Sequence, residues 1–245
     1  MSNLPKLDKL LKKQALVAEE TGMRNLLDYA ENIVAIENAI AVVSDLKNGN
    51  SRIFAGRLGK VLGIDDYANE NSIWEKKILS LLTEEDREEK YLAELRFFNY
   101  LRRLPRKSRL DYYLLSKLRM KTLEGEYIGI IHRMYYIYAP DSDSITHALC
   151  LYGREVFDMA GKSMVVNSLT GLSEELTSAG DSSILSKREV QVLKLIDSGK
   201  TSADIAALLS ISKNTVSRHR QEILAKLQVK NSLEACRLAK TMRII

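Results

Sequence analysis

The sequence predicts an α+β domain with an antiparallel sheet, followed by a small all-α domain of four helices. Strand-like runs between residues 36 and 152 alternate with turns and helices and do not follow a βαβ rhythm. Apolar residues after position 184 recur at helical spacing behind four capping signals. Small and polar residues dominate the stretch between the two regions. We therefore divide the chain into an N-terminal helical segment (1–35), an α+β domain (36–169), a linker (170–183) and a helical domain (184–245).

The N-terminal elements can be followed in order. Helical spacing covers residues 7–18 and 26–34, with a break expected at Thr21-Gly22. Short strands at 39–43 and 51–55 flank Asn48-Gly49, a dipeptide suited to a hairpin turn. Residues 72–103 are helical by pattern. Runs rich in tyrosine and isoleucine at 111–120, 127–138 and 145–152 then predict a three-stranded antiparallel meander.

Four helix starts in the last region follow from capping chemistry. Ser186, Thr201, Ser212 and Asn231 each precede an apolar helical pattern, and three of them have an acidic residue three positions later that can complete a capping box. The residues expected on the apolar faces are Val190, Leu193 and Ile196, then Ile205, Ala206, Leu208 and Leu209, then Val216, Ile223, Leu224 and Leu227, and finally Leu233, Cys236 and Ala239. Two short helices joined by a tight turn at 210–212 predict a helix-turn-helix unit.

Composition and charge narrow the class of function. The chain is 45% hydrophobic and 28% charged, as in ordinary globular proteins, and no apolar run approaches the roughly 20 residues that span a bilayer. Two distant cysteines fit no metal-ligand spacing, so we expect a cytoplasmic protein with no membrane partner and no bound metal. Residues 184–245 carry 12 Lys/Arg against 5 Asp/Glu, whereas residues 1–183 carry 25 against 27. This excess of positive charge favours a polyanionic partner such as nucleic acid.

Polar residues on the predicted third helix suit contacts with double-stranded DNA. Arginine can hydrogen-bond guanine with two donors, and glutamine can pair with adenine. The residues that lie off the apolar face of this helix are Lys213, Asn214, Ser217, Arg218 and Gln221. Those expected to contact phosphates are Thr201, Lys213, Asn214, Thr215, Arg220, Lys226 and Lys230.

These residues resemble the LuxR/NarL (GerE-type) DNA-binding domain. The matching features are Ser186-x-Arg188-Glu189, Gly199, Asp204-Ile205-Ala206, Leu209-x-Ile211-Ser212, Thr215-Val216-x-x-His219 and Lys226-Leu227. The resemblance implies that Ser217, Arg218 and Gln221 enter the groove and that the fourth helix is a dimer contact. It therefore implies a homodimeric, sequence-specific transcriptional regulator, with RNA polymerase as a further expected partner.

The N-terminal part resembles a PAS-like sensor domain more weakly. The resemblance lies in the element order over residues 36–152, an acidic residue at Asp86 and the hairpin turn Glu124-Gly125-Glu126. It implies a sensing or dimerisation role and leaves open an unidentified small-molecule ligand. His132 and His147 sit on adjacent predicted strands, yet we interpret each as an ordinary strand residue and predict no cofactor.

Two other classes of function compete with the regulator. An enzyme with an appended basic domain would need a catalytic constellation, but the sequence has no glycine-rich phosphate loop or nucleophile–base pair and only three histidines. We therefore predict no enzymatic activity. A protein-interaction adaptor would keep the helix-turn-helix fold without reading DNA. The basic excess and the polar third helix favour DNA binding over that alternative.

Overall fold

The computed structural model describes residues 7, 11, 20–140, 142–157, 159, 161–177, 185–227, 229, 231–241 and 244–245. The chain forms two compact units, Met1–Leu176 and Thr177–Ile245. The first unit contains α2 (Glu20–Glu37), β1 (Ile40–Asp45), β2 (Asn50–Phe54), α3 (Gly56–Leu62), β3 (Asn69–Glu70), α4 (Lys76–Leu81), α5 (Glu84–Arg103), α6 (Arg106–Arg109), β4 (Tyr112–Lys121), β5 (Tyr127–Tyr138), β6 (Ile145–Arg154), β7 (Ser163–Asn167) and β8 (Ser173–Glu175). The second contains α8 (Lys187–Asp197), α9 (Ser202–Leu209), α10 (Lys213–Leu227) and α11 (Ser232–Thr241).

One antiparallel sheet organises the first unit. Its strand order is β3-β2-β1-β6-β5-β4-β7-β8. The predicted hairpin β1–β2 and the predicted meander β4–β5–β6 are both present, and β1 pairs with β6 to join them. Distant parts of the sequence therefore meet at the centre of the sheet.

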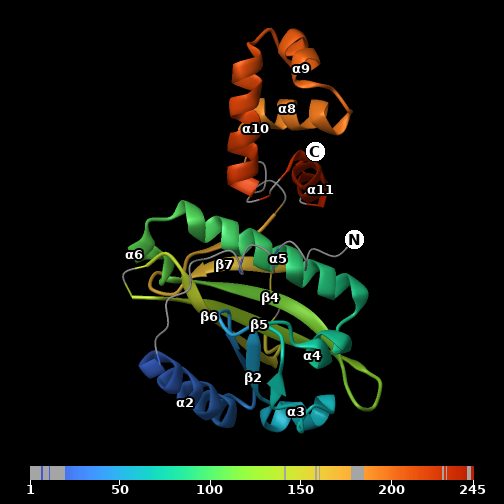
Figure 1. Cartoon of the computed structure of the whole chain (residues 1–245). Helices are drawn as coiled ribbons and strands as arrows, with labels where there is room; N and C mark the ends of the chain where they lie inside the picture. Colours follow the sequence, from blue (N-terminus) through green and yellow to red (C-terminus); the bar gives the residue numbers. More distant parts are fainter. Residues whose placement is uncertain are drawn as a thin grey trace. The chain divides into compact units, whose positions relative to one another are not determined.

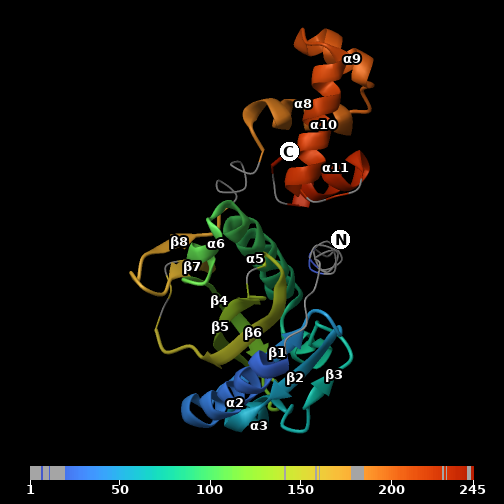
Figure 2. The same cartoon turned by 60° about the vertical axis from the view of Figure 1, so that its left-hand side comes forward.

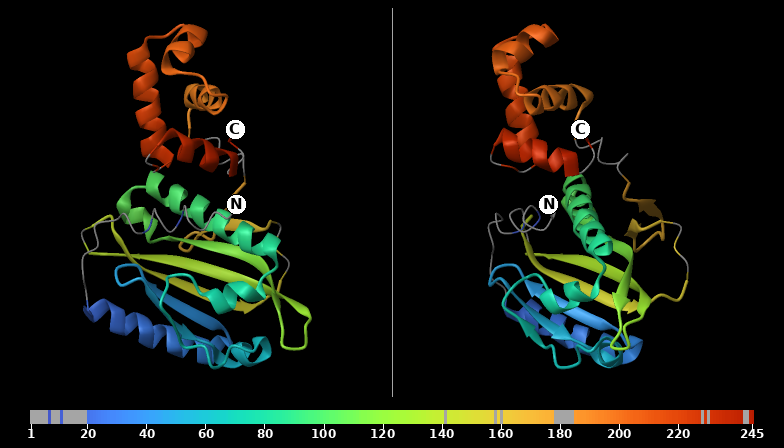
Figure 3. Two further views of the ribbon diagram at one scale, coloured as in Figure 1. Left: turned by 45° about the vertical axis from the view of Figure 1, so that its right-hand side comes forward. Right: turned by 90° about the vertical axis from the view of Figure 1, so that its right-hand side faces the viewer.

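The sheet has two different faces (Figures 1 and 3). One face packs on α2 through an apolar cluster that includes Ala30, Val34, Leu149 and Leu151. The opposite face lies under α5, where Phe97 stacks on Tyr136 of β5 with ring centroids 5.6 Å apart. Because side chains alternate along a strand, neighbouring residues of β5 and β6 belong to different faces.

Several N-terminal elements differ from the prediction. The helix α2 runs through Thr21-Gly22 without the expected break. The helical region 72–103 is two helices, because Thr83 caps α5 by accepting a hydrogen bond from the Asp86 amide. Strands β3, β7 and β8 were not expected. Strand β8 pairs with β7 and lies within residues 170–183, the stretch predicted as a linker, so the first part of that stretch belongs to the sheet. Residues 178–184 lie outside the described part of the chain.

Within its described residues, the second unit contains α8, α9, α10 and α11 where helices were predicted (Figure 2). They pack around a small apolar core. Leu193, Ile205, Val216, Ile223 and Leu227 are buried as expected. The prediction was wrong for two leucines, since Leu208 and Leu233 are 60% and 61% exposed. Each helix is short and amphipathic, so a one-position error in the helical phase places an apolar residue outside the core. Ala235 and Leu238 bury the inner face of α11 instead.

Candidate nucleic-acid interface

Local capping fixes where α8 and α9 begin. Ser186 and Glu189 form a complete capping box at α8, and Thr201 and Asp204 form a second one at α9. Each box satisfies amides at a helix start that have no partner inside the helix. These two boxes and the Ser212 cap, whose Oγ accepts from the Thr215 amide at 3.0 Å, confirm three helix starts read from the sequence. At the fourth, Asn231 Oδ1 accepts from the Glu234 amide at 2.9 Å.

The turn between α9 and α10 is held from two sides. Ser210 ends α9 in the left-handed region, with φ 51° and ψ 46°. Arg188 reaches across from α8 and donates from Nη2 to the carbonyl oxygen of Leu209 at 2.7 Å. A cation beside the carbonyl end of a helix is also favoured by the helix dipole. A side chain from α8 therefore contacts the end of α9 at this turn.

The predicted base-reading residues lie together on the exposed face of α10. Ser217, Arg218 and Gln221 are all exposed, as are Lys213 and Asn214 at the start of the helix. Among the described residues, Arg218 forms a surface ion pair, with its Nε 3.5 Å from Glu222 Oε1. Such pairs contribute little to stability, so this guanidinium is available to another partner. The buried residues of α10 occupy the opposite side.

The predicted phosphate-contacting residues fall into two groups. Arg220 is half-buried and donates to Ser202 Oγ at 3.0 Å and to Ser232 Oγ at 2.9 Å, so it braces α9 and α11 against α10. Lys226 bonds to the buried carboxylate of Glu189 at 2.7 Å and so links α10 to α8. Lys213 and Asn214 face solvent, whereas Thr201 and Thr215 take part in caps. Lys230 lies outside the described residues.

Sequence reasoning missed the bracing roles of these residues. Glu189 was expected as a capping residue, but its carboxylate also accepts from Lys226, 37 positions away. Burial alone raises the pKa of Glu189, and the hydrogen bonds from Lys226 and Ser186 outweigh it and lower the pKa. The capping motif predicts the local contact, whereas no local pattern predicts the contact with α10.

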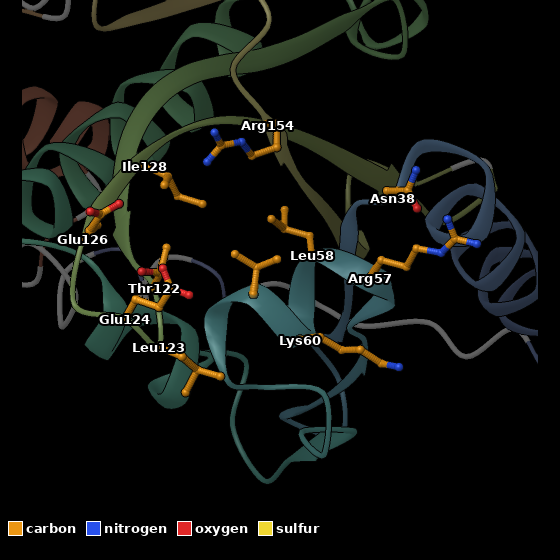
Figure 4. A pocket seen from close by; sticks show the side chains of 11 residues that line it. Asn38, Arg57, Leu58, Lys60, Thr122, Leu123, Glu124, Glu126, Ile128 and Arg154 are labelled. Carbon is orange, nitrogen blue, oxygen red and sulfur yellow. The ribbon is translucent and has the colours of Figure 1, made fainter.

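The first unit contains an open cleft between α3, the β4–β5 hairpin and the end of β6 (Figure 4). Its volume is about 630 Å³, and Leu58 and Ile128 lie between its charged walls. Arg57 and Lys60 come from α3, whereas Glu124 and Glu126 come from the hairpin turn. The cleft therefore offers separated charges of both signs around an apolar surface.

The two strand histidines are on opposite faces of the sheet. His132 pairs with Tyr152 and faces α5, where the two rings stack 4.7 Å apart. His147 pairs with Ile137, which packs on the α2 side. A pair of histidine ligands on one cofactor is therefore ruled out for these positions. No helix in the described ranges is both long and apolar enough to cross a membrane.

Comparison with known proteins identifies the second unit. Residues 183–239 match the family described as GerE, bacterial regulatory proteins of the luxR family. The "Oxygen regulatory protein NreC" of Staphylococcus epidermidis is 33% identical over 111 residues, covering 44% of this chain and 51% of that protein. The "Regulatory protein SdiA" of Escherichia coli K12 is 46% identical over 57 residues, 23% of this chain and 24% of the relative. The match thus covers about half the length of NreC and about a quarter of the length of SdiA.

Solved structures give weaker matches over more of the chain. A phage VqmA–DPO complex covers 91% of this chain and 88% of that one, with 16% identity and a TM-score of 0.29. A Vibrio cholera VqmA–ligand–DNA complex covers 88% of each chain, with 14% identity and the same TM-score of 0.29.

Proposed function

Because residues 183–239 belong to the LuxR family of bacterial regulatory proteins, we propose that this protein is a sequence-specific, DNA-binding transcriptional regulator. The observation that carries the proposal is the exposed polar face of α10, with Ser217, Arg218 and Gln221 side by side on one surface. An α-helix fits the major groove, and these side chains can bond base edges there. Lys213 and Asn214 at the start of α10 are positioned for neighbouring phosphates.

The first unit suits a sensing or dimerisation role in a cytoplasmic homodimer. Its central strands follow the order β2-β1-β6-β5-β4 with α5 across one face, which supports the PAS-like interpretation. The cleft of Figure 4 offers space for a small ligand. RNA polymerase is the partner expected of the DNA-bound regulator. Light scattering of the purified full chain tests the homodimer, and a monomeric mass in the presence of operator DNA contradicts it.

Selection of random duplex DNA by the full-length protein tests DNA binding directly. We expect an enriched inverted repeat, because two copies of α10 related by a two-fold axis read two half-sites. Arg218→Ala should weaken binding to the selected site by roughly 1–3 kcal/mol, about 5- to 150-fold, and relax selection at one position of each half-site.

The matched control is Lys194→Ala, which removes an exposed cation from α8 of the same unit. This change should weaken all sequences equally and leave the selected motif intact, since it alters only long-range attraction. Equal losses on every sequence for Arg218→Ala would contradict base reading. If no duplex is enriched over a range of salt, the adaptor interpretation replaces the regulator.

A further inference from the structure

A cluster of ionisable side chains is sealed between α5 and the sheet of the first unit. Glu94 comes from α5, His132 from β5 and Cys150 from β6, and their exposed fractions are 2%, 0% and 5%. Their candidate ligand atoms, a carboxylate oxygen, an imidazole nitrogen and the thiol sulfur, all lie within 4.8 Å of one another. The sheet register explains the approach, because Cys150 pairs with Met134, two residues from His132 on the same face of β5.

His132 lacks the partners that a buried imidazole needs. Neither ring nitrogen has a hydrogen bond within the described structure, although the side chain is fully buried. Leaving a buried polar group unsatisfied costs about 1–3 kcal/mol. Because neither nitrogen has a hydrogen-bond partner among the described residues, the imidazole has a lone pair that no described residue uses. A free lone pair of this kind is what a metal ion uses.

Among the described residues, buried acidic groups outnumber basic ones around the cluster. Lys90 pairs with Glu94 Oε1 at 2.5 Å, and both side chains are buried. Glu75 is also buried, with its carboxylate 3.2 Å from the hydroxyl of Tyr152. With both carboxylates ionised, these three described side chains sum to one negative charge in a region where unpaired charge is expensive. A divalent cation that displaces the proton of Cys150 would bring the sum to zero.

The donor set and the available space select the kind of ion. One nitrogen, one sulfur and one oxygen ligand suit a borderline transition metal, and tetrahedral Zn²⁺ with bonds of roughly 2.0–2.3 Å is the best match. A small cavity of about 20 Å³ adjoins Glu94 and Cys150, enough for one water as a fourth ligand. The second oxygen of Glu94 remains for the metal while Lys90 keeps Oε1, so the ion pair acts as an outer support of the site.

We propose that Glu94, His132 and Cys150 form a binding site for a divalent transition-metal ion, with Zn²⁺ as the preferred ion, inside the first unit. The inference goes beyond the proposed DNA-binding function and does not depend on it, because none of the three residues belongs to the helix-turn-helix unit. It also revises the expectation of no metal, which rested on the spacing of the two cysteines along the sequence.

Cobalt substitution of the chelator-stripped, full-length protein tests the site. Co²⁺ bound to a thiolate has an intense near-ultraviolet charge-transfer band, so we expect this band to rise to one equivalent per chain. The decisive variant is Cys236→Ser, which leaves Cys150 as the only thiol. Retention of the band in this variant supports the assignment, and loss of the band overturns it.

Two histidine variants complete the experiment. His132→Gln should weaken Zn²⁺ binding at least tenfold in calorimetry, whereas the control His147→Gln, on the other face of the sheet, should bind as the parent protein does. Zn²⁺ should also raise the melting temperature followed through Trp74, the only tryptophan, by stabilising the folded state. Absence of both the cobalt band and the thermal shift in the parent protein would sink the proposal. Selection of DNA by the same sample tests the proposed DNA binding independently, so that failure of one proposal can be distinguished from failure of the other.

Discussion

The two units of the chain each bury a glutamate against a lysine, but they do so in different ways. In the first unit Lys90 and Glu94 are 1% and 2% exposed. In the second, Glu189 is 1% exposed while its partner Lys226 is 44% exposed and also meets solvent. Glu189 further accepts a hydrogen bond from the Ser186 amide as part of the cap of α8. The second unit therefore places its charge at a helix start and at the rim of the core, whereas the first encloses charge within the core.

This difference fits the different roles proposed for the two units. A buried ion pair is seldom the most stable filling for a core, since apolar residues of similar volume often serve as well or better. The buried pair in the first unit fits the proposed metal site, in which Lys90 supports Glu94. The second unit has a largely apolar interior, with Glu189 at its rim, and carries the polar residues proposed to contact DNA on its surface.

The largest expected effect comes from Lys90→Met in metal-free protein. Removing the ammonium leaves Glu94 buried without its partner, and breaking such a pair costs about 3–5 kcal/mol. Burial raises the pKa of Glu94 and Lys90 opposes that rise, so without Lys90 the side chain must either stay charged and unpaired or take up a proton. Urea unfolding followed by Trp74 fluorescence measures the loss, because this residue reports on the first unit alone.

Two controls sharpen this test. Lys77→Met breaks the exposed pair with Asp66 and should leave the same unfolding curve unchanged, because surface pairs contribute little. The double change Lys90→Met with Glu94→Leu should recover most of the lost stability, since it removes both charges together. If the single and double variants were equally unstable, packing and not charge would explain the loss.

The matching change in the second unit is Glu189→Gln, with a smaller expected cost of about 2 kcal/mol at neutral pH, the range for hydrogen bonds to charged groups. The pKa of Glu189 is lower in the folded chain than its ordinary value of 4.5. Its contribution is therefore complete above that value and is lost as pH falls through the folded pKa. The helix signal in urea titrations at several pH values measures it.

The difference between parent and variant should shrink steadily below about pH 4.5. A difference that stays constant with pH would mean that the carboxylate is not the group that stabilises this unit. The Trp74 transition of the first unit serves as an internal control, because Glu189 lies in the second unit.

The comparison also explains what the sequence could predict. The caps at Ser186, Thr201 and Ser212, the hairpin β1–β2 and the meander β4–β6 were predicted, because each depends on residues a few positions apart. The exposed face of α10 was predicted through helical periodicity and the family resemblance, and Ser217, Arg218 and Gln221 are exposed. Their contact with a DNA groove stays a prediction.

Long-range arrangements could not be predicted in the same way. The Glu94–His132–Cys150 cluster arises from three elements and from the register of β5 with β6, which no local pattern specifies. Strand β8 has the sequence Ser-Glu-Glu with every residue exposed, so it has no hydrophobic alternation to reveal it. Leu208 and Leu233 show the reverse error, since an apolar residue at helical spacing still depends on tertiary neighbours for burial.

Arg220→Met distinguishes a bracing arginine from a DNA-reading one. Loss of its hydrogen bonds to Ser202 and Ser232 should cost about 1–2 kcal/mol of unfolding free energy, measured by the helix signal in urea. Arg218→Ala, on the exposed face, should leave this unfolding curve unchanged while it impairs DNA selection. Unchanged stability in Arg220→Met would mean that Arg220 does not brace the helices, and phosphate contact would be its remaining predicted role.

The smallest effect concerns the left-handed turn between α9 and α10. Ser210 has φ 51°, a conformation that costs a residue with a Cβ roughly 1 kcal/mol more than glycine. Since glycine also loses more backbone freedom on folding, Ser210→Gly should stabilise the second unit by only about 0.5 kcal/mol.

Gly199→Ala gives the opposite change at the end of α8. Gly199 has φ 76°, and an added Cβ would meet nothing within 4 Å, so the substitution measures backbone conformation without a steric clash. We expect a loss of about 1 kcal/mol in the same helix-detected urea titration. Opposite signs for the two variants would show that backbone conformation at the helix ends limits the stability of this unit. If Ser210→Gly instead lowered stability, contacts of the serine side chain would help to hold the turn. The hydrogen bond from Arg188 to Leu209 would then not be enough to explain how the turn is held.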